Sequence, residues 1–107
     1  MKIPNEIRIN GVEFSVGYAP NLRMNDKLCF GYIDFDNSKI MLSETDGTEH
    51  QQRCITFLHE VIHGIIKNSA VEVFDEEPVV EMLSRGIYQV LQDNGERLFD
   101  LKEGKKK

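Results

Sequence analysis

The segment that most constrains this chain is His59-Glu60-Val61-Ile62-His63, which reads H-E-x-x-H inside the apolar run TFLHEVIHGII. Residues four apart lie on one face of an α-helix, a single turn from each other. A helix here therefore places both imidazoles where they can bind one metal ion, with the intervening glutamate beside a metal-bound water. The motif predicts zinc ligands at His59 and His63 and a general base at Glu60.

The helix that carries the motif is expected over about residues 49–67. Thr48, three residues before Gln51, forms a capping-box pattern that opens a helix. His59 and His63 lie at the edge of its apolar stripe, where a second element can reach them. The residues of that stripe are Ile55, Leu58, Ile62, Ile65 and Ile66.

A second helix is expected over about residues 78–93. Pro78 suits the first turn of a helix, and Asn94-Gly95 suits its end. A tail of about residues 96–107 follows. The predicted buried stripe of this helix is Val80, Leu83, Ile87, Val90 and Leu91.

Residues 3–43 have a β pattern. Asn10-Gly11 separates two runs of alternating apolar residues, which is the strongest short signal for a hairpin. A second pair of strands flanks the turn residues 36–38, and Gly31 within it predicts a bulge or a close backbone approach. We expect three or four antiparallel strands, with Lys39–Ser43 as an edge that can pair with an extended substrate.

Length and composition indicate one α+β domain over residues 1–107, a small antiparallel sheet packed on two helices. The chain has 107 residues, 40% hydrophobic and 29% charged, with a net charge of −5. The acidic balance argues against nucleic acid as a partner, and no apolar run is long enough to suggest a membrane partner. No secretory signal is evident, so the expected location is the cytoplasm. Cys29 and Cys54 are expected to be reduced and buried.

A catalytic zinc ion usually has three protein ligands and one open position. His50 lies nine residues before His59, about 13 Å along a helix, and is too distant to share the ion. The third ligand is therefore expected to be a carboxylate near the start of the second helix. We favour Glu81, 18 residues after His63, with Glu77 as runner-up. The remaining candidates are Glu72, Asp75 and Glu76.

The order HEVIHGI followed by EEPVVEMLSRGIYQVLQDN resembles gluzincin-type metallopeptidases, and more narrowly small phage-encoded relatives of the ImmA/IrrE family. The resemblance covers about residues 31–94. It implies a minimal zincin-like domain with His59, His63 and Glu81 as metal ligands and Glu60 as base. Ser84 and Arg85 stand where the family has Ala-Asn. It also implies a phage or mobile-element context and regulatory proteins as substrates.

The sequence thus predicts a zinc metalloendopeptidase (a hydrolase using Zn²⁺) that acts on a protein or peptide. Tyr88, two turns beyond Glu81, is a candidate for oxyanion support, with packing in the core as the alternative. Ser43 and Asp34 are candidates to orient a ligand histidine. The alternative functions are a zinc-binding module without catalysis and an interaction module that retains the motif.

Overall fold

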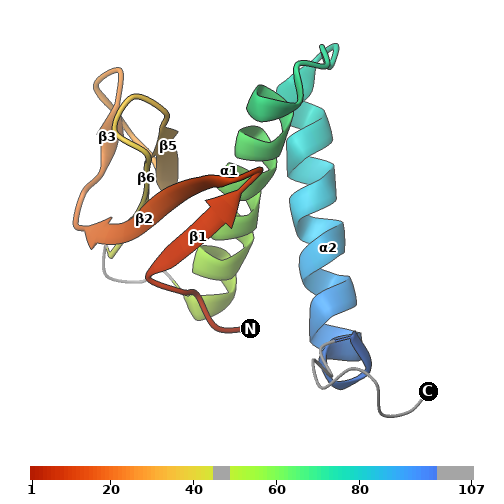
Figure 1. Ribbon diagram of the computed structural model, residues 1–107. Helices are drawn as coiled ribbons and strands as arrows, with labels where there is room; N and C mark the ends of the chain where they lie inside the picture. The colour runs from red at the N-terminus through yellow and green to blue at the C-terminus, as the bar shows by residue number, and fades with distance from the viewer. Residues whose placement is uncertain (45–48, 99–107) are drawn as a thin grey trace.

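The computed structural model of the protein describes residues 1–44 and 49–98. Figure 1 shows three layers: a sheet, a first helix packed on it, and a second helix packed on the far side of the first. In chain order the elements are β1 (Glu6–Ile9), β2 (Val12–Ala19), β3 (Arg23–Met24), β4 (Lys27–Leu28), β5 (Gly31–Asp34), β6 (Lys39–Ser43), α1 (His50–Ser69) and α2 (Glu76–Leu98).

The main sheet has four strands in the order β1-β2-β6-β5, and β3 and β4 form a separate two-stranded ribbon. β1 pairs with β2, and β5 with β6, as antiparallel hairpins. The expectation of an antiparallel sheet is wrong for the central pair, because β2 and β6 run parallel. Turn chemistry determines each hairpin, whereas the way two hairpins join depends on the crossover between them. The sheet is therefore mixed.

The same topology corrects the predicted edge strand. Lys39–Ser43 forms β6, which lies between β2 and β5 and has a neighbour on each side. β5 is the edge strand on that side of the sheet. Any extended segment that adds to this edge must therefore pair with β5.

The predicted hairpin at Asn10-Gly11 is confirmed. Both residues have positive φ, 49° and 86°, as a two-residue type I′ turn requires. The turn fixes the register of β1 on β2 and directs Ile9 and Phe14 into the core. The buried core cluster between sheet and helix consists of Ile9, Phe14, Val16, Ile40, Leu42 and Phe57.

Glycines allow the sheet and α1 to approach closely. A Cβ atom on Gly31 would lie 2.7 Å from Thr56 Cγ2 and 2.8 Å from the Met41 carbonyl oxygen, which confirms the predicted close approach. A Cβ atom on Gly64 would lie 3.0 Å from Ile9 Cδ1. The absence of a side chain at Gly31 and Gly64 therefore lets β5 and β1 lie directly against the helix that carries the motif.

α1 covers residues 50–69, close to the predicted range, and ends at Ala70 in the left-handed region with φ 63°. Its N-cap is Glu49, without a side-chain capping bond, and Thr48 lies outside the described residues. Ile55 and Ile62 are buried as predicted, whereas Ile65 is 44% exposed. Ile65 is exposed because the sheet contacts the neighbouring face, which carries Phe57 and Gly64.

α2 begins at Glu76, two residues earlier than predicted, and continues to Leu98 with a kink at Asn94. The predicted tail beyond residue 98 lies outside the described residues. The face packed on α1 carries Val80, Ser84 and Tyr88. Leu83, Ile87 and Val90, predicted to be buried, are exposed. Apolar residues occupy two faces of α2, and only packing selects which face meets α1.

Neither described helix has the length and apolar character needed to cross a bilayer.

Candidate metal centre

The two histidines of the motif point toward each other from successive turns of α1. Their Nε2 atoms are 3.2 Å apart, and their ring centroids are separated by 4.9 Å. Both side chains are mostly buried, with 15% and 20% exposure, and both line a cavity. This convergence is what helix periodicity predicts for residues 59 and 63.

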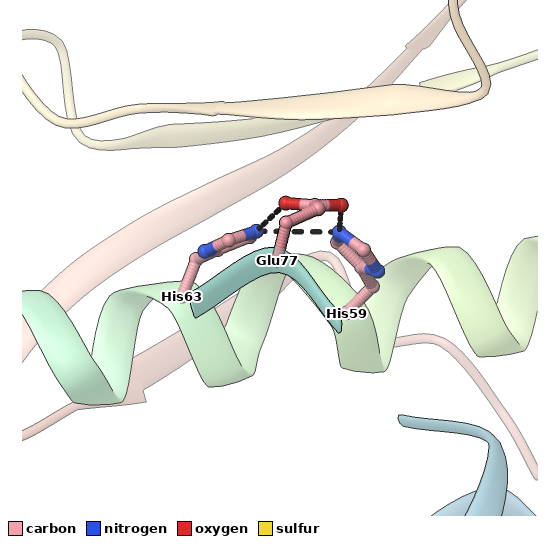
Figure 2. A group of neighbouring side chains, drawn as sticks. All are labelled: His59, His63 and Glu77. Carbon is pink, nitrogen blue, oxygen red and sulfur yellow. Dashed lines mark hydrogen bonds and ion pairs between the residues drawn. The ribbon is translucent and has the colours of Figure 1, made fainter. Parts of the chain in front are cut away.

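Glu77 completes a cluster with the two Nε2 atoms (Figure 2). Its Oε2 lies 2.9 Å from His59 Nε2, and its Oε1 lies 3.0 Å from His63 Nε2. The carboxylate comes from the first turn of α2, so the cluster joins the two helices. Glu77 was the runner-up for the third ligand in the sequence, and it is the carboxylate that faces both Nε2 atoms.

Glu81 and Glu76 lie on the opposite side of the imidazole rings. Glu81 Oε1 is 3.1 Å from His59 Nδ1, and Glu76 Oε2 is 2.7 Å from His63 Nδ1. Arg85 Nε donates to the other oxygen of Glu81 at 2.7 Å, and this contact holds the pKa of Glu81 below its usual value. The favoured candidate therefore contacts the ring nitrogen that points away from the cluster.

The antiparallel packing of α2 on α1 explains this division. Glu77 and Glu81 are one turn apart on α2, as His63 and His59 are on α1. The start of α2 consequently meets His63, and its second turn meets His59. The sequence favours Glu81 because it lies one turn inside the expected helix, 18 residues after His63. In the structure α2 already begins at Glu76, so Glu77 is helical and lies one turn before Glu81 on the same face.

The donor set fits a zinc ion. A neutral imidazole carries one N–H, so rings that donate Nδ1–H to Glu76 and Glu81 direct both Nε2 lone pairs at each other and at Glu77. A cation between these atoms removes the repulsion. Tetrahedral zinc with bonds of about 2.0–2.1 Å separates its ligand atoms by about 3.3 Å. The observed separations of 2.9, 3.0 and 3.2 Å are close to this value.

Glu60 lies beside the cluster and is the most deeply buried of the acidic side chains near it, at 7% exposure. Burial raises the pKa of its carboxyl group, and the nearby His59 and His63 partly offset this effect. The side chain lines the same cavities as His59. It is therefore located where a proton can be exchanged with a molecule held at the cluster.

Two cavities share lining residues here, and we refer to them together as the groove. A cavity of about 430 Å³ extends toward Ile33, Phe35 and Lys67. A cavity of about 250 Å³ extends the other way, toward Gln52 and Arg85. Both are lined by Gly31, His59 and Glu60, whereas His63 and Glu77 line only the larger cavity. The cavities therefore extend to either side of His59 and Glu60, and Gly31 of the edge strand β5 lines both.

Other sequence candidates lie elsewhere or have other partners. Tyr88 is 7% exposed, packs with Cys54 and Ile55, and lines neither cavity of the groove, which agrees with the packing interpretation. Asp34 accepts hydrogen bonds from Asn37 Nδ2 and the Asn37 backbone N–H in the β5–β6 turn. The carbonyl oxygen of Ser43 accepts a hydrogen bond from Arg53.

His50 contacts the Met1 carbonyl oxygen and Cys54 rather than the cluster, as its spacing indicates. Both cysteines are free; Cys54 is buried and Cys29 is partly exposed. The sequence offered Glu76 only as one of the remaining candidates for the third ligand, whereas the structure places it at His63 Nδ1. The sequence gave Lys67 no role. The spacing of Lys67, four residues after His63, is the signal that points to the groove.

Comparison of the chain with protein-family models, with curated proteins and with solved structures finds no match.

Proposed function

We propose that this protein is a zinc-dependent metalloendopeptidase with a minimal zincin-like domain, related to the ImmA/IrrE family. The observation that carries the proposal is that a possible metal-binding cluster and a buried glutamate lie together in one groove. The two Nε2 atoms of the H-E-x-x-H motif converge on Glu77. The buried Glu60 lies beside them, and the groove extends to both sides.

In this proposal His59, His63 and Glu77 hold the metal, and Glu76 and Glu81 orient the two imidazoles through Nδ1. A zinc ion held there would lower the pKa of water and polarise a substrate carbonyl. Glu60 accepts the proton that water loses on attack and returns it to the leaving amine. Its burial keeps this carboxylate away from bulk solvent and next to the reacting groups.

The groove supports a peptide substrate in an extended conformation. β5 is an edge strand and can pair with added backbone. Gln52 lines one cavity and Lys67 the other, and 15 helical residues separate them by about 22 Å. At about 3.3 Å per residue this length accommodates about six or seven residues. Because the groove continues on both sides of the cluster, cleavage inside a chain is favoured over removal of terminal residues.

The test combines metal analysis with turnover. Zinc-loaded wild type should cleave peptides from a mixed library, and Glu60→Gln should keep near-stoichiometric zinc while losing turnover by about 10²- to 10⁴-fold. His59→Ala should lose the metal. A wild type that binds zinc and cleaves nothing, or a Glu60→Gln variant as active as wild type, would contradict the proposal.

A second candidate function is a non-catalytic zinc module. It is favoured by the fact that the cluster joins α1 to α2, so a metal there would fasten the outer helix to the rest of the domain. Zinc binding with no turnover for any peptide, and melting temperatures that depend on zinc, would support this candidate over the peptidase.

A further inference from the structure

Lys67 continues the line of the two histidines along α1. Residues 59, 63 and 67 are spaced by four, so their side chains lie one above another on the same helical face. Lys67 lines the larger cavity of the groove together with both histidines. It is the single lysine or arginine among the described residues that line this cavity.

The ammonium group of Lys67 is directed toward the sheet. Its Nζ lies 5.3 Å from the centre of the Phe35 ring, which is a cation–π contact. Within the described residues, no carboxylate lies within ion-pair distance of it. Glu76 and Glu77 pair with the histidines. Glu72 and Asp75 line a neighbouring cavity, which Lys67 also lines, and neither makes an ion pair with it.

The cavity that Lys67 lines has apolar side chains from the β3–β5 region, and its acidic lining residues Glu60, Glu76 and Glu77 lie at or beside the histidines. Met24, Ile33 and Phe35 line the same cavity, and Met24 is 44% exposed although it is a large apolar side chain. A ligand group that fits here needs an apolar stem, which contacts these three residues, and a negative end, which meets Lys67. Among the side chains of a peptide, glutamate has this combination.

We propose that Met24, Ile33, Phe35 and Lys67 form a specificity subsite that binds an acidic side chain of the substrate, and we name it the Lys67 subsite. Lys67 lies one turn beyond His63, about 6 Å along the axis of α1. This corresponds to about two residues of extended peptide. The acidic residue therefore lies about two positions from the cleaved bond, on the His63 side. The inference rests on the proposed peptidase function and adds its substrate class.

The test measures binding separately from turnover. The probes are fluorescein-labelled hexapeptides of alanine and leucine in which Glu, Gln or Lys occupies each position in turn. Zinc-loaded Glu60→Gln protein binds the probes without cleaving them, and fluorescence anisotropy reports the affinity. At one position the Glu peptide should bind about five- to tenfold more tightly than the Lys peptide.

Charge reversal identifies the residue responsible. Lys67→Glu, added to Glu60→Gln, should invert the preference at that position, and Lys67→Met should make the Glu and Lys peptides equal in affinity. Lys2→Glu is the matched control, because it changes the net charge equally but lies in a different cavity at the other end of α2. It should leave the preference unchanged.

Two outcomes would overturn the subsite: equal affinity for Glu and Lys peptides at every position, or a Glu preference that survives Lys67→Glu. Turnover by zinc-loaded wild type is assayed with the same peptides. A Glu preference in binding without cleavage leaves the subsite standing and contradicts the peptidase. Cleavage without any charge preference supports the peptidase and contradicts the subsite.

Discussion

At the scale of single residues, the candidate centre depends on how three glutamates of α2 are distributed over four imidazole nitrogens. Glu77 reaches both Nε2 atoms, whereas Glu81 and Glu76 each contact one Nδ1 atom. A carboxylate at Nδ1 fixes the tautomer and orientation of a ligand histidine without binding the metal. Substitutions of the three glutamates should therefore have separable effects on zinc affinity.

Glu77→Gln should weaken zinc binding by more than 100-fold, because it replaces the charged group that faces both Nε2 atoms. Glu81→Gln and Glu76→Gln should each weaken it by about 10- to 100-fold, as expected for partners of ligand histidines. Competition with a chromophoric chelator measures all three dissociation constants. A larger loss for Glu81→Gln than for Glu77→Gln would assign the third ligand to Glu81, as the family resemblance implies.

The two cysteines should differ in reactivity. Burial raises the pKa of both thiols, and Cys54 is fully buried against His50 and Met1, whereas Cys29 is partly exposed. Since the thiolate is the reactive form, iodoacetamide should label native Cys29 first and Cys54 only after unfolding. The labelling rate of native Cys29 should still rise above about pH 9.5, where that of denatured cysteine, with its pKa of about 8.5, levels off. Mass spectrometry of the labelled peptides measures both rates, and equal rates would contradict the prediction.

At the scale of elements, the approach of β5 to α1 determines whether the edge strand can form a wall of the groove. Gly31 lies at the start of β5 and lines both cavities. The Thr56 side chain and the backbone of β6 occupy the space that a side chain at this position would need. The geometry of the groove thus depends on an unsubstituted residue at position 31.

Gly31→Ala should destabilise the protein by about 1–3 kcal/mol, because one methyl group forces the strand and the helix apart. Turnover should fall as well, since the shift moves β5 relative to His59 and Glu60. Urea denaturation measures the free energy of unfolding. Gly86→Ala is the matched control: it lies in α2 with no atom within 4 Å of its Cβ position, and should stabilise the helix by about 0.5–1 kcal/mol. A Gly31→Ala variant as stable as wild type would contradict the close approach.

At the scale of the whole molecule, the outer helix α2 packs on α1, which in turn packs on the sheet (Figure 1). The centre adds a second connection between the two helices, through Glu77 and the two histidines. Metal binding should therefore stabilise the folded domain and most of all the start of α2. This expectation follows from mass action, because the unfolded chain does not hold the three ligands together.

Removal of zinc with a chelator should lower the stability by about 3 kcal/mol relative to protein at a free zinc concentration of 100 times the dissociation constant. For a domain of this size the melting temperature falls by roughly 10 °C. Amide hydrogen exchange should increase at the start of α2 more than in the sheet. His59→Ala should show no response to the chelator, and a wild type equally unresponsive would contradict a metal centre.

The features that the sequence predicted correctly are those that depend on local interactions. The turn at Asn10-Gly11, the range of α1 and the convergence of His59 and His63 depend on residues at most a few positions apart. Turn chemistry and the 3.6-residue period act over that distance. The parallel pairing of β2 with β6 joins residues more than 20 positions apart, and no local pattern encodes it.

The sequence by itself determined that this chain is an α+β domain in which one helix brings two imidazoles and a glutamate together. The tertiary structure decided which carboxylate faces them, because Glu77 and Glu81 are one turn apart on the same face of α2 and only the position of α2 along α1 selects between them. It also made β5 the edge strand and placed Lys67 in the groove beside Phe35. Each of these depends on how whole elements pack, and packing brings together residues that are distant in the chain.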